Sequence, residues 1–233
     1  MGALSGIKLS RPTYDDVVPS SGKKVKLTPF RVGDEKTLLI AAQSSSMKDM
    51  NNALKSVVKN CVQGIEIEEL EQYDLEYLFL KLRAKSVGEH SEIAIRCESC
   101  GAMNQLSVDL EAVVVEKSTE HKNIVKIEEA LAFKMKFPDP ELISDLDATN
   151  PNDMIKIVVM SVETVYSGEE AIEINESDRD ELKELIESMT KEQFEKMEEF
   201  FETLPRLKKD VQFICGECSH DNNQTLEGLA SFF

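Results

Sequence analysis

Four of the five cysteines stand in two C-x2-C pairs, Cys97 with Cys100 and Cys215 with Cys218. Thiolates at this spacing hold a metal ion from one tight turn, and two such turns complete the tetrahedral coordination of a structural Zn2+. Four protein thiolates leave no coordination position open for water or substrate, so this set supports structural metal binding rather than catalysis. We therefore expect one structural zinc ion per chain, held by these four residues.

The separation of the two pairs is unusual for a zinc ribbon. Residues 101–214 lie between them, where a compact ribbon has roughly 15–20 residues. A whole subdomain is therefore expected to be inserted into the ribbon. Two alternatives are a pair of separate redox sites and two pairs that hold no metal. A redox pair of the thioredoxin type lies at a helix N-terminus, whereas both pairs here follow predicted strands, which favours the shared zinc site.

Other reactive side chains do not form a catalytic pattern. Cys61 falls on the apolar stripe of a predicted helix and is interpreted as a buried core residue. His220 follows Cys218 closely but is interpreted as an exposed loop residue. His90 and His121 have no carboxylate, serine or cysteine neighbour at a spacing that would indicate a catalytic role. Acidic pairs on helix faces are expected to be solvated, and no phosphate-cradling glycine loop occurs. We expect a protein that is not an enzyme.

The elements that must position the cysteines are short strands. Alternating apolar residues flank both pairs, as in strands: Ile93, Ile95, Leu106, Val108 and Leu110 around the first pair, and Val211 and Phe213 before the second, with 225–229 after it. Each C-x2-C pair is therefore predicted to lie at the tip of a β-hairpin.

The N-terminal region is predicted to form a hairpin and three helices. Turn-forming residues at 19–22 divide residues 12–30 into two β-prone runs. Helices are predicted over 31–43, with Leu38, Leu39, Ala41 and Ala42 as the apolar side, over 47–63, and over 74–85, with Asp74 as the N-terminal cap. The core face of the third helix is expected to consist of Leu75, Leu78, Phe79 and Leu82.

The insertion is predicted to be mixed α/β. We expect a strand around 131–137, a helix over 152–165, a short strand over 171–174 that pairs with 131–137, and two amphipathic helices over 177–204. The fold class is therefore α+β: an N-terminal β-hairpin plus helices, then a split zinc ribbon with four cysteine ligands and a large mixed α/β acidic insertion. The expected domains are 1–90, the ribbon halves 91–110 and 211–233, and the insertion 111–210.

The net charge of −17 is unevenly distributed. Residues 1–90 carry 13 Lys and Arg against 12 Asp and Glu, whereas residues 91–233 carry 14 against 32. Such a field repels phosphate backbones and favours basic protein partners, so nucleic acid is not expected as a partner. No apolar run approaches the roughly 20 residues that span a bilayer, and we expect a soluble protein made in a cytoplasm.

Several segments resemble a known family. Residues 19–25 (PSSGKKV), 29–30 (PF), 35–36 (EK), 38–39 (LL) and above all 73–89 (YDLEYLFLKLRAKSVGE) are similar to the T4-type bacteriophage baseplate hub family of contractile-tailed phages. The resemblance is strongest over the first 100 residues or so.

The resemblance implies a non-enzymatic protein that helps to build the central hub of the tail baseplate. It is expected to contact other baseplate hub and tail proteins, with the tape-measure protein among the candidates, in the bacterial host cytoplasm during assembly or in the virion. Arg83 and Lys85 are candidate interface charges, although a solvated helix end explains them equally well. The alternative function is a zinc-ribbon regulator that binds nucleic acid or polymerase.

Overall fold

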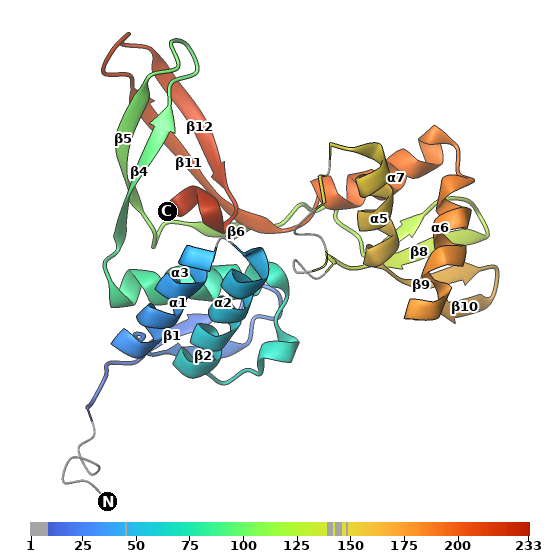
Figure 1. Ribbon diagram of the computed structural model, residues 1–233, viewed down its shortest axis with the longest axis horizontal. Helices are drawn as coiled ribbons and strands as arrows, with labels where there is room; N and C mark the ends of the chain where they lie inside the picture. Colours follow the sequence, from blue (N-terminus) through green and yellow to red (C-terminus); the bar gives the residue numbers. More distant parts are fainter. Residues whose placement is uncertain (1–8, 45, 139–141, 143–145, 148) are drawn as a thin grey trace, which may run out of the picture. The chain divides into compact units, whose positions relative to one another are not determined.

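The computed structural model describes residues 9–44, 46–138, 142, 146–147 and 149–233. The chain divides into two compact units (Figure 1): unit 1 combines the chain up to Glu116 with Arg206–Phe233, and unit 2 is Lys117–Pro205. The fold is α+β, as predicted. None of the helices in the described ranges is long and apolar enough to cross a membrane.

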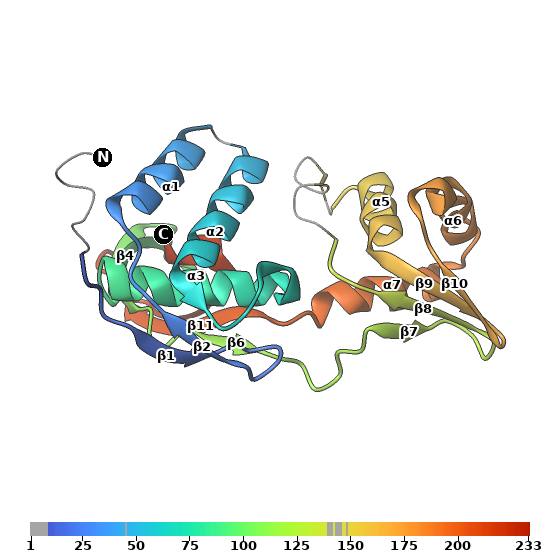
Figure 2. The same cartoon turned by 90° about the horizontal axis from the view of Figure 1, so that it is seen from below.

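The N-terminal part of unit 1 is a small sheet covered by helices. Strands β1 (Tyr14–Val17) and β2 (Lys24–Leu27) form the predicted hairpin, and β3 (Val62–Gln63) pairs with β2. Helices α1 (Val32–Ser44), α2 (Met47–Cys61) and α3 (Gln72–Ser86) lie on one face of this sheet, with a 3-10 turn at Ile67–Glu69 (Figure 2).

Helix α3 is apolar on two sides. Its predicted core face packs into the first core with strand β2 and helix α2, through Leu75, Leu78, Phe79 and Leu82. Leu80 and Ala84 face a second core that contains the ribbon strands. Because α3 contributes to both cores, it fixes the ribbon to the N-terminal part of unit 1.

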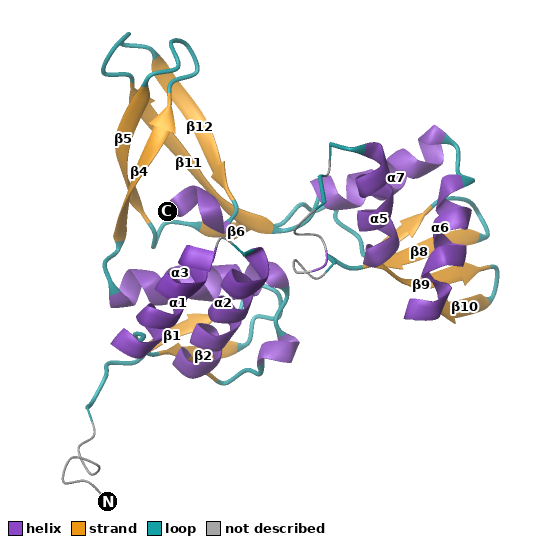
Figure 3. Ribbon diagram, in the orientation of Figure 1, coloured by secondary structure: helices purple, strands orange, loops and turns teal. Residues whose placement is uncertain are grey.

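The ribbon consists of two hairpins that Figure 3 shows side by side. Strands β4 (His90–Arg96) and β5 (Met103–Asp109) form the first, and β11 (Arg206–Ile214) and β12 (Asp221–Glu227) the second. A short strand β6 (Val114–Glu116) pairs antiparallel with the start of β11, and a 3-10 turn (Leu229–Phe232) follows β12. The predicted hairpins around both C-x2-C pairs are confirmed.

Unit 2 is a four-stranded antiparallel sheet with helices packed on it. The strand order is β10 (Glu170–Glu173), β9 (Val162–Ser167), β8 (Leu131–Met135) and β7 (Ile124–Lys126). Helices α5 (Pro151–Ser161), α6 (Arg179–Glu187) and α7 (Lys191–Glu202) close the core around the buried Phe133, Val158, Ile186 and Met197. A 3-10 turn, Glu176–Asp178, precedes α6.

Two predictions for this unit are wrong. The helix predicted over 152–165 ends at Ser161, and the chain continues as strand β9 from Val162. The strand predicted over 171–174 exists as β10, but it pairs with β9 rather than with 131–137. The hairpin of β9 and β10 explains both differences, since β9 occupies the position beside β8 that β10 was expected to take.

Two predictions for unit 1 also need correction. In α1 only Ala41 is buried, whereas Leu39 is 58% exposed and Ala42 is exposed as well. Helix α3 begins at Gln72 with Glu71 as its N-cap, so Asp74 lies inside the first turn. Its buried carboxylate still caps the helix, because it accepts a hydrogen bond from the Glu71 amide at 3.0 Å, and it accepts a second from the Ser20 amide at 2.8 Å.

Most of the negative charge belongs to unit 2. Residues 117–205 carry ten Lys and Arg against 23 Asp and Glu, and the rest of the chain carries 17 against 21. The chain leaves unit 1 after β6 and returns at the start of β11. There Glu116 and Arg206 lie opposite each other in the antiparallel pair of β6 and β11.

Candidate metal centre

The two cysteine pairs lie in knuckles of the same backbone geometry. In the first, the Cys97 amide donates to the Ala102 carbonyl at 2.8 Å and the Gly101 amide to the Cys97 carbonyl at 3.0 Å. In the second, the Cys215 amide donates to the His220 carbonyl at 2.9 Å, and the Ser219 amide to the Cys215 carbonyl at the same distance. The fifth residue of each knuckle has a positive φ, 74° at Gly101 and 59° at Ser219. This tight turn places the sulfur atoms of both cysteines of a pair on the same side of the knuckle.

The structure brings the four predicted cysteines together. Their sulfur atoms all lie within 4.8 Å of one another. The closest pairs connect the two knuckles: Cys97 Sγ lies 3.7 Å from Cys218 Sγ, and Cys100 Sγ 3.7 Å from Cys215 Sγ. Cys97 and Cys215 are buried, while Cys100 and Cys218 are exposed at the tips.

This arrangement fits a tetrahedral metal ion. Metal–sulfur bonds of about 2.3 Å give a tetrahedron whose sulfur–sulfur edges are about 3.8 Å, close to the two separations of 3.7 Å between the knuckles. A covalent S–S bond is about 2.05 Å long, much shorter than these separations. The four cysteines are therefore placed to bind a metal ion, with no position left open for a substrate.

The knuckle backbones favour thiolates at the first cysteine of each pair. The amides of Cys100 and Ser99 and the side chain of Asn222 hydrogen-bond to Cys97 and lower the pKa of its thiol. The amides of Cys218 and Glu217, with the side chain of Asn104, lower the pKa of Cys215 to about 6.

The second cysteine of the first pair behaves differently. The Ala102 amide acts to lower the pKa of Cys100, but the neighbouring thiols, Cys218 foremost, and desolvation outweigh it and raise that pKa to about 12. Four adjacent thiolates repel one another, so full ionisation of this cluster requires a cation among them. A divalent metal ion supplies that charge.

Asn104 and Asn222 are site residues that the sequence reasoning missed. Each lies four residues after the second cysteine of its own hairpin, and each contacts the opposite knuckle: Asn104 Oδ1 accepts from the Gly216 amide, and Asn222 Oδ1 from the Glu98 amide, both at 3.0 Å. The repeated spacing C-x2-C-x3-N is visible in the sequence, and it is the signal that would have identified them.

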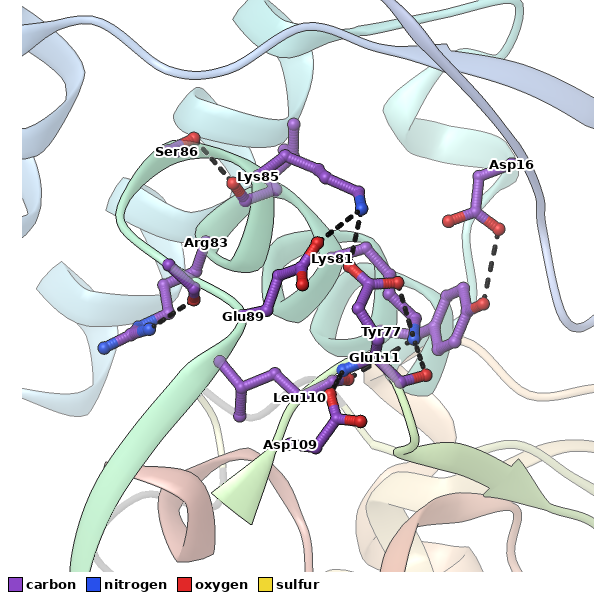
Figure 4. A network of polar contacts seen from close by, with 12 residues as sticks. Asp16, Tyr77, Lys81, Arg83, Lys85, Ser86, Glu89, Asp109, Leu110 and Glu111 are labelled. Atoms are coloured by element: carbon purple, nitrogen blue, oxygen red, sulfur yellow. Dashed lines mark hydrogen bonds and ion pairs between the residues drawn. The ribbon is translucent and has the colours of Figure 1, made fainter. Parts of the chain in front are cut away.

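Helix α3 holds the ends of the β4–β5 hairpin that lie far from the metal centre (Figure 4). The buried Lys81 ammonium donates to the carbonyls of Leu110 at 3.3 Å and Glu111 at 2.6 Å, just after β5. Arg83 donates to the carbonyls of Gly88 at 2.9 Å and His90 at 3.3 Å, where β4 begins. Both ends of the hairpin are thus fastened to one helix.

Lys85 completes this network, since its ammonium forms ion pairs with Glu111 at 3.2 Å and Glu89 at 3.3 Å. The Glu111 carboxylate, through its hydrogen bond, and Glu89 raise the pKa of Lys85. Arg83 and Lys85 therefore bind groups of their own chain, and these contacts account for both charges without an interface.

Among the described residues, the side chains that could hold a metal ion together are those of the four cysteines, and the other candidate side chains are not part of this group. Cys61 is buried in the first core, as expected, and burial raises the pKa of its thiol. His220 is exposed. His121, in unit 2, contacts the Thr203 hydroxyl at 3.0 Å and packs against the ring of Phe200.

Comparison with known proteins identifies a family. No curated protein and no solved structure is significantly similar to the chain. The family model described as T4 bacteriophage base plate protein matches residues 11–233, which include both units and both knuckles. The chain therefore belongs to the T4 bacteriophage base plate protein family.

Proposed function

We propose that the chain is a non-enzymatic structural or assembly protein of the baseplate hub in a contractile phage tail, acting through protein–protein contacts. The observation that carries the proposal is the family match over residues 11–233. The assignment to the hub rests on the resemblance of residues 73–89, which include most of α3. The partners are other baseplate hub and tail proteins, with the tape-measure protein among the candidates, and assembly takes place in the host cytoplasm.

The metal centre has a structural role in this proposal. We propose that Cys97, Cys100, Cys215 and Cys218 hold one Zn2+, which joins two cysteine pairs more than a hundred residues apart in sequence. A site with four protein thiolates holds the hairpins together and offers no position for catalysis. In this proposal the zinc ion stabilises the ribbon, and the protein surface rather than the metal makes the contacts with partners.

Helix α1 supports a role in protein contacts. Val32, Leu39 and Ile40 lie on one side of the helix at spacings of seven and eight residues, and they are 82%, 58% and 57% exposed. A cluster of apolar side chains in water favours association. We propose that another baseplate protein covers this side of α1 in the assembled particle.

The experiment is affinity purification of the tagged chain from infected cells, with mass spectrometry of the bound proteins. Baseplate and tail proteins should be recovered with the wild type and lost with Ile40→Lys. The matched control is Ile172→Lys, since Ile172 is 47% exposed but lies in unit 2. Absence of the chain from both assembly intermediates and finished particles would contradict the function, whereas unchanged recovery with Ile40→Lys would contradict only the role of α1.

The zinc proposal has its own test. Metal analysis of the purified chain should find one zinc ion per chain, and Cys100→Ser should loosen both hairpins, because metal binding and folding are coupled in such sites. Amide exchange of the two hairpins measures this directly. A variant in which β11 and β12 stay fully ordered would argue against a site shared by both knuckles.

The alternative, a zinc-ribbon regulator of nucleic acid or polymerase, is favoured only by the cysteine cluster itself. The net charge of −17 opposes binding to a phosphate backbone. Direct DNA binding would weaken steeply with salt. A filter-binding titration that finds strong, salt-dependent retention of DNA would favour this alternative over the baseplate role.

A further inference from the structure

The metal centre contains an internal repeat that extends beyond the cysteines. Residues 97–104 and 215–222 share the pattern C-x2-C-x3-N, and the asparagine stands near the start of the returning strand in both hairpins, β5 and β12. The two knuckles also share the same pattern of backbone hydrogen bonds. The two asparagines therefore occupy equivalent positions around the cysteine cluster.

Asn104 reaches from the first hairpin to the second knuckle. Its side-chain oxygen accepts from the Gly216 amide at 3.0 Å, and its side-chain nitrogen donates to Cys215 Sγ at 3.7 Å. The same nitrogen also donates to the Ala102 carbonyl in its own knuckle at 3.1 Å. One amide group thus connects the turn before β5 with a sulfur atom of the opposite hairpin.

Asn222 makes the reciprocal set of contacts. Its oxygen accepts from the Glu98 amide at 3.0 Å, its nitrogen donates to the His220 carbonyl at 3.0 Å, and its side chain also hydrogen-bonds to Cys97. The side chain is fully buried. A buried polar group needs a partner of fitting geometry, so these contacts are costly to lose.

We infer that Asn104 and Asn222 are positioning residues that cross-brace the zinc site: from each hairpin, one amide fixes the first cysteine of the other. The inference rests on the proposed zinc. An amide side chain supplies both the acceptor for the knuckle amide and the donor for the sulfur. Aspartate, of nearly the same shape, keeps the acceptor, loses the donor and places a negative charge beside a thiolate.

The first test measures zinc affinity of the full-length chain by competition with a chromogenic chelator. Asn104→Asp and Asn222→Asp should each bind zinc about 10–100-fold more weakly than the wild type, the usual effect of losing a partner of a metal ligand. The control is Asn223→Asp, which adds the same charge one residue away on the exposed face of β12 and should bind as the wild type does. The Co2+-loaded Asn104→Asp protein should keep the spectrum of four sulfur ligands, since no ligand is removed.

The second test asks whether the bracing crosses between hairpins. Amide exchange measured by NMR should accelerate at Gly216 in Asn104→Ala and at Glu98 in Asn222→Ala. A side chain that only stabilised its own hairpin would accelerate exchange around its own knuckle instead. Asn104 is half-buried, so its variants should fold and test the inference even if replacement of the buried Asn222 prevents folding.

The outcomes separate the two proposals. A wild-type chain that binds no zinc overturns the metal assignment and the cross-bracing with it. A wild-type chain that binds one zinc ion, together with Asn104→Asp and Asn222→Asp affinities within about threefold of it, overturns the cross-bracing alone. Weaker binding in both asparagine variants with no change in Asn223→Asp supports it.

Discussion

Gly101 and Ser219 occupy the same left-handed position in the two knuckles, with different residue types. A side chain in this conformation costs about 1–2 kcal/mol, and glycine avoids that cost at the expense of greater flexibility when unfolded. Ser219→Gly should therefore stabilise the protein by up to about 1 kcal/mol, and Gly101→Ser should destabilise it by a similar amount. Thermal unfolding at fixed zinc concentration measures both, and shifts of the same sign in both variants would contradict the argument.

Asp74 connects α3 to the turn of the first hairpin through the amides of Glu71 and Ser20. Its carboxylate is fully buried, so Asp74→Ala would leave two amides without an acceptor and should lower the free energy of unfolding by about 2–4 kcal/mol. Urea unfolding measures the loss. Asp15→Ala is the control, because Asp15 forms an exposed ion pair with Lys26 and the loss of such a pair should change the stability little.

Glu76 gives α3 a pH-dependent contribution to stability. Desolvation raises the pKa of its carboxyl, and hydrogen bonds from Gln72 and the Leu229 amide only partly offset this. A raised folded-state pKa means that the folded protein binds the proton more tightly, so this contribution is present below the unfolded pKa of about 4.3 and is lost as the pH rises through the folded value.

Glu76→Gln should consequently be more stable than the wild type at pH 7, and the difference should shrink towards zero below about pH 4. The Gln side chain keeps one acceptor oxygen and carries no charge to desolvate. Urea unfolding of the two proteins at several pH values tests this, and a stability difference that does not change with pH would disprove the assigned cause.

Residues that act within a short spacing were predictable from the sequence, and residues that act across the fold were not. The four cysteines follow a spacing rule, and the structure brings them together. The contact of Asn104 with the Gly216 amide joins residues 112 positions apart, and an asparagine at the start of a strand has no local signature for it. Only the repeat of both asparagines at one spacing would have pointed to their common role.

At the scale of elements, the two apolar sides of α3 determine how the ribbon is held. Lys81 is the polar part of this junction: its side chain is 6% exposed and its ammonium donates to two carbonyls after β5. Lys81→Met keeps the packing of the stem but leaves both carbonyls without their donor, and should cost about 1–3 kcal/mol. Lys85→Met, one turn later with 23% side-chain exposure, should cost less in the same urea titration. A larger loss of stability in Lys85→Met than in Lys81→Met would contradict this role of Lys81.

The errors in element prediction have local causes. Residues 162–167 (VETVYS) are rich in β-branched and aromatic side chains, which favour a strand. Val162 also continues the apolar helix stripe of Val158 and Val159, so the periodicity extended the predicted helix, whereas pairing with β8 makes this segment a strand. The predicted apolar side of α1 is only partly buried: Ala41 is buried and Leu38 packs against the first core, whereas Leu39 and Ala42 are exposed. The pattern of apolar residues does not distinguish a core face from a face that binds a partner.

At the scale of the whole molecule, unit 2 is inserted at a point where the chain already forms a hairpin-like pair. Glu116 at the end of β6 lies opposite Arg206 at the start of β11, and opposite residues in an antiparallel pair are about 4.5–5.5 Å apart. Each unit has its own core. A two-residue turn is long enough to join such ends, so β6 and β11 can pair in unit 1 without any residue of unit 2.

Replacement of residues 117–205 by Asn-Gly should therefore leave unit 1 folded, with one zinc ion per chain and a cooperative thermal transition. The variant would also lose most of the acidic surface, because the removed residues carry 23 of the 44 Asp and Glu but only ten of the 27 Lys and Arg. Metal analysis and calorimetry test the fold, and the same purification from infected cells shows which partners depend on the acidic unit. Loss of zinc from the shortened chain would mean that the two ribbon hairpins need unit 2 to meet, whereas retained zinc with altered partners would separate the metal-held scaffold from the surface that it presents.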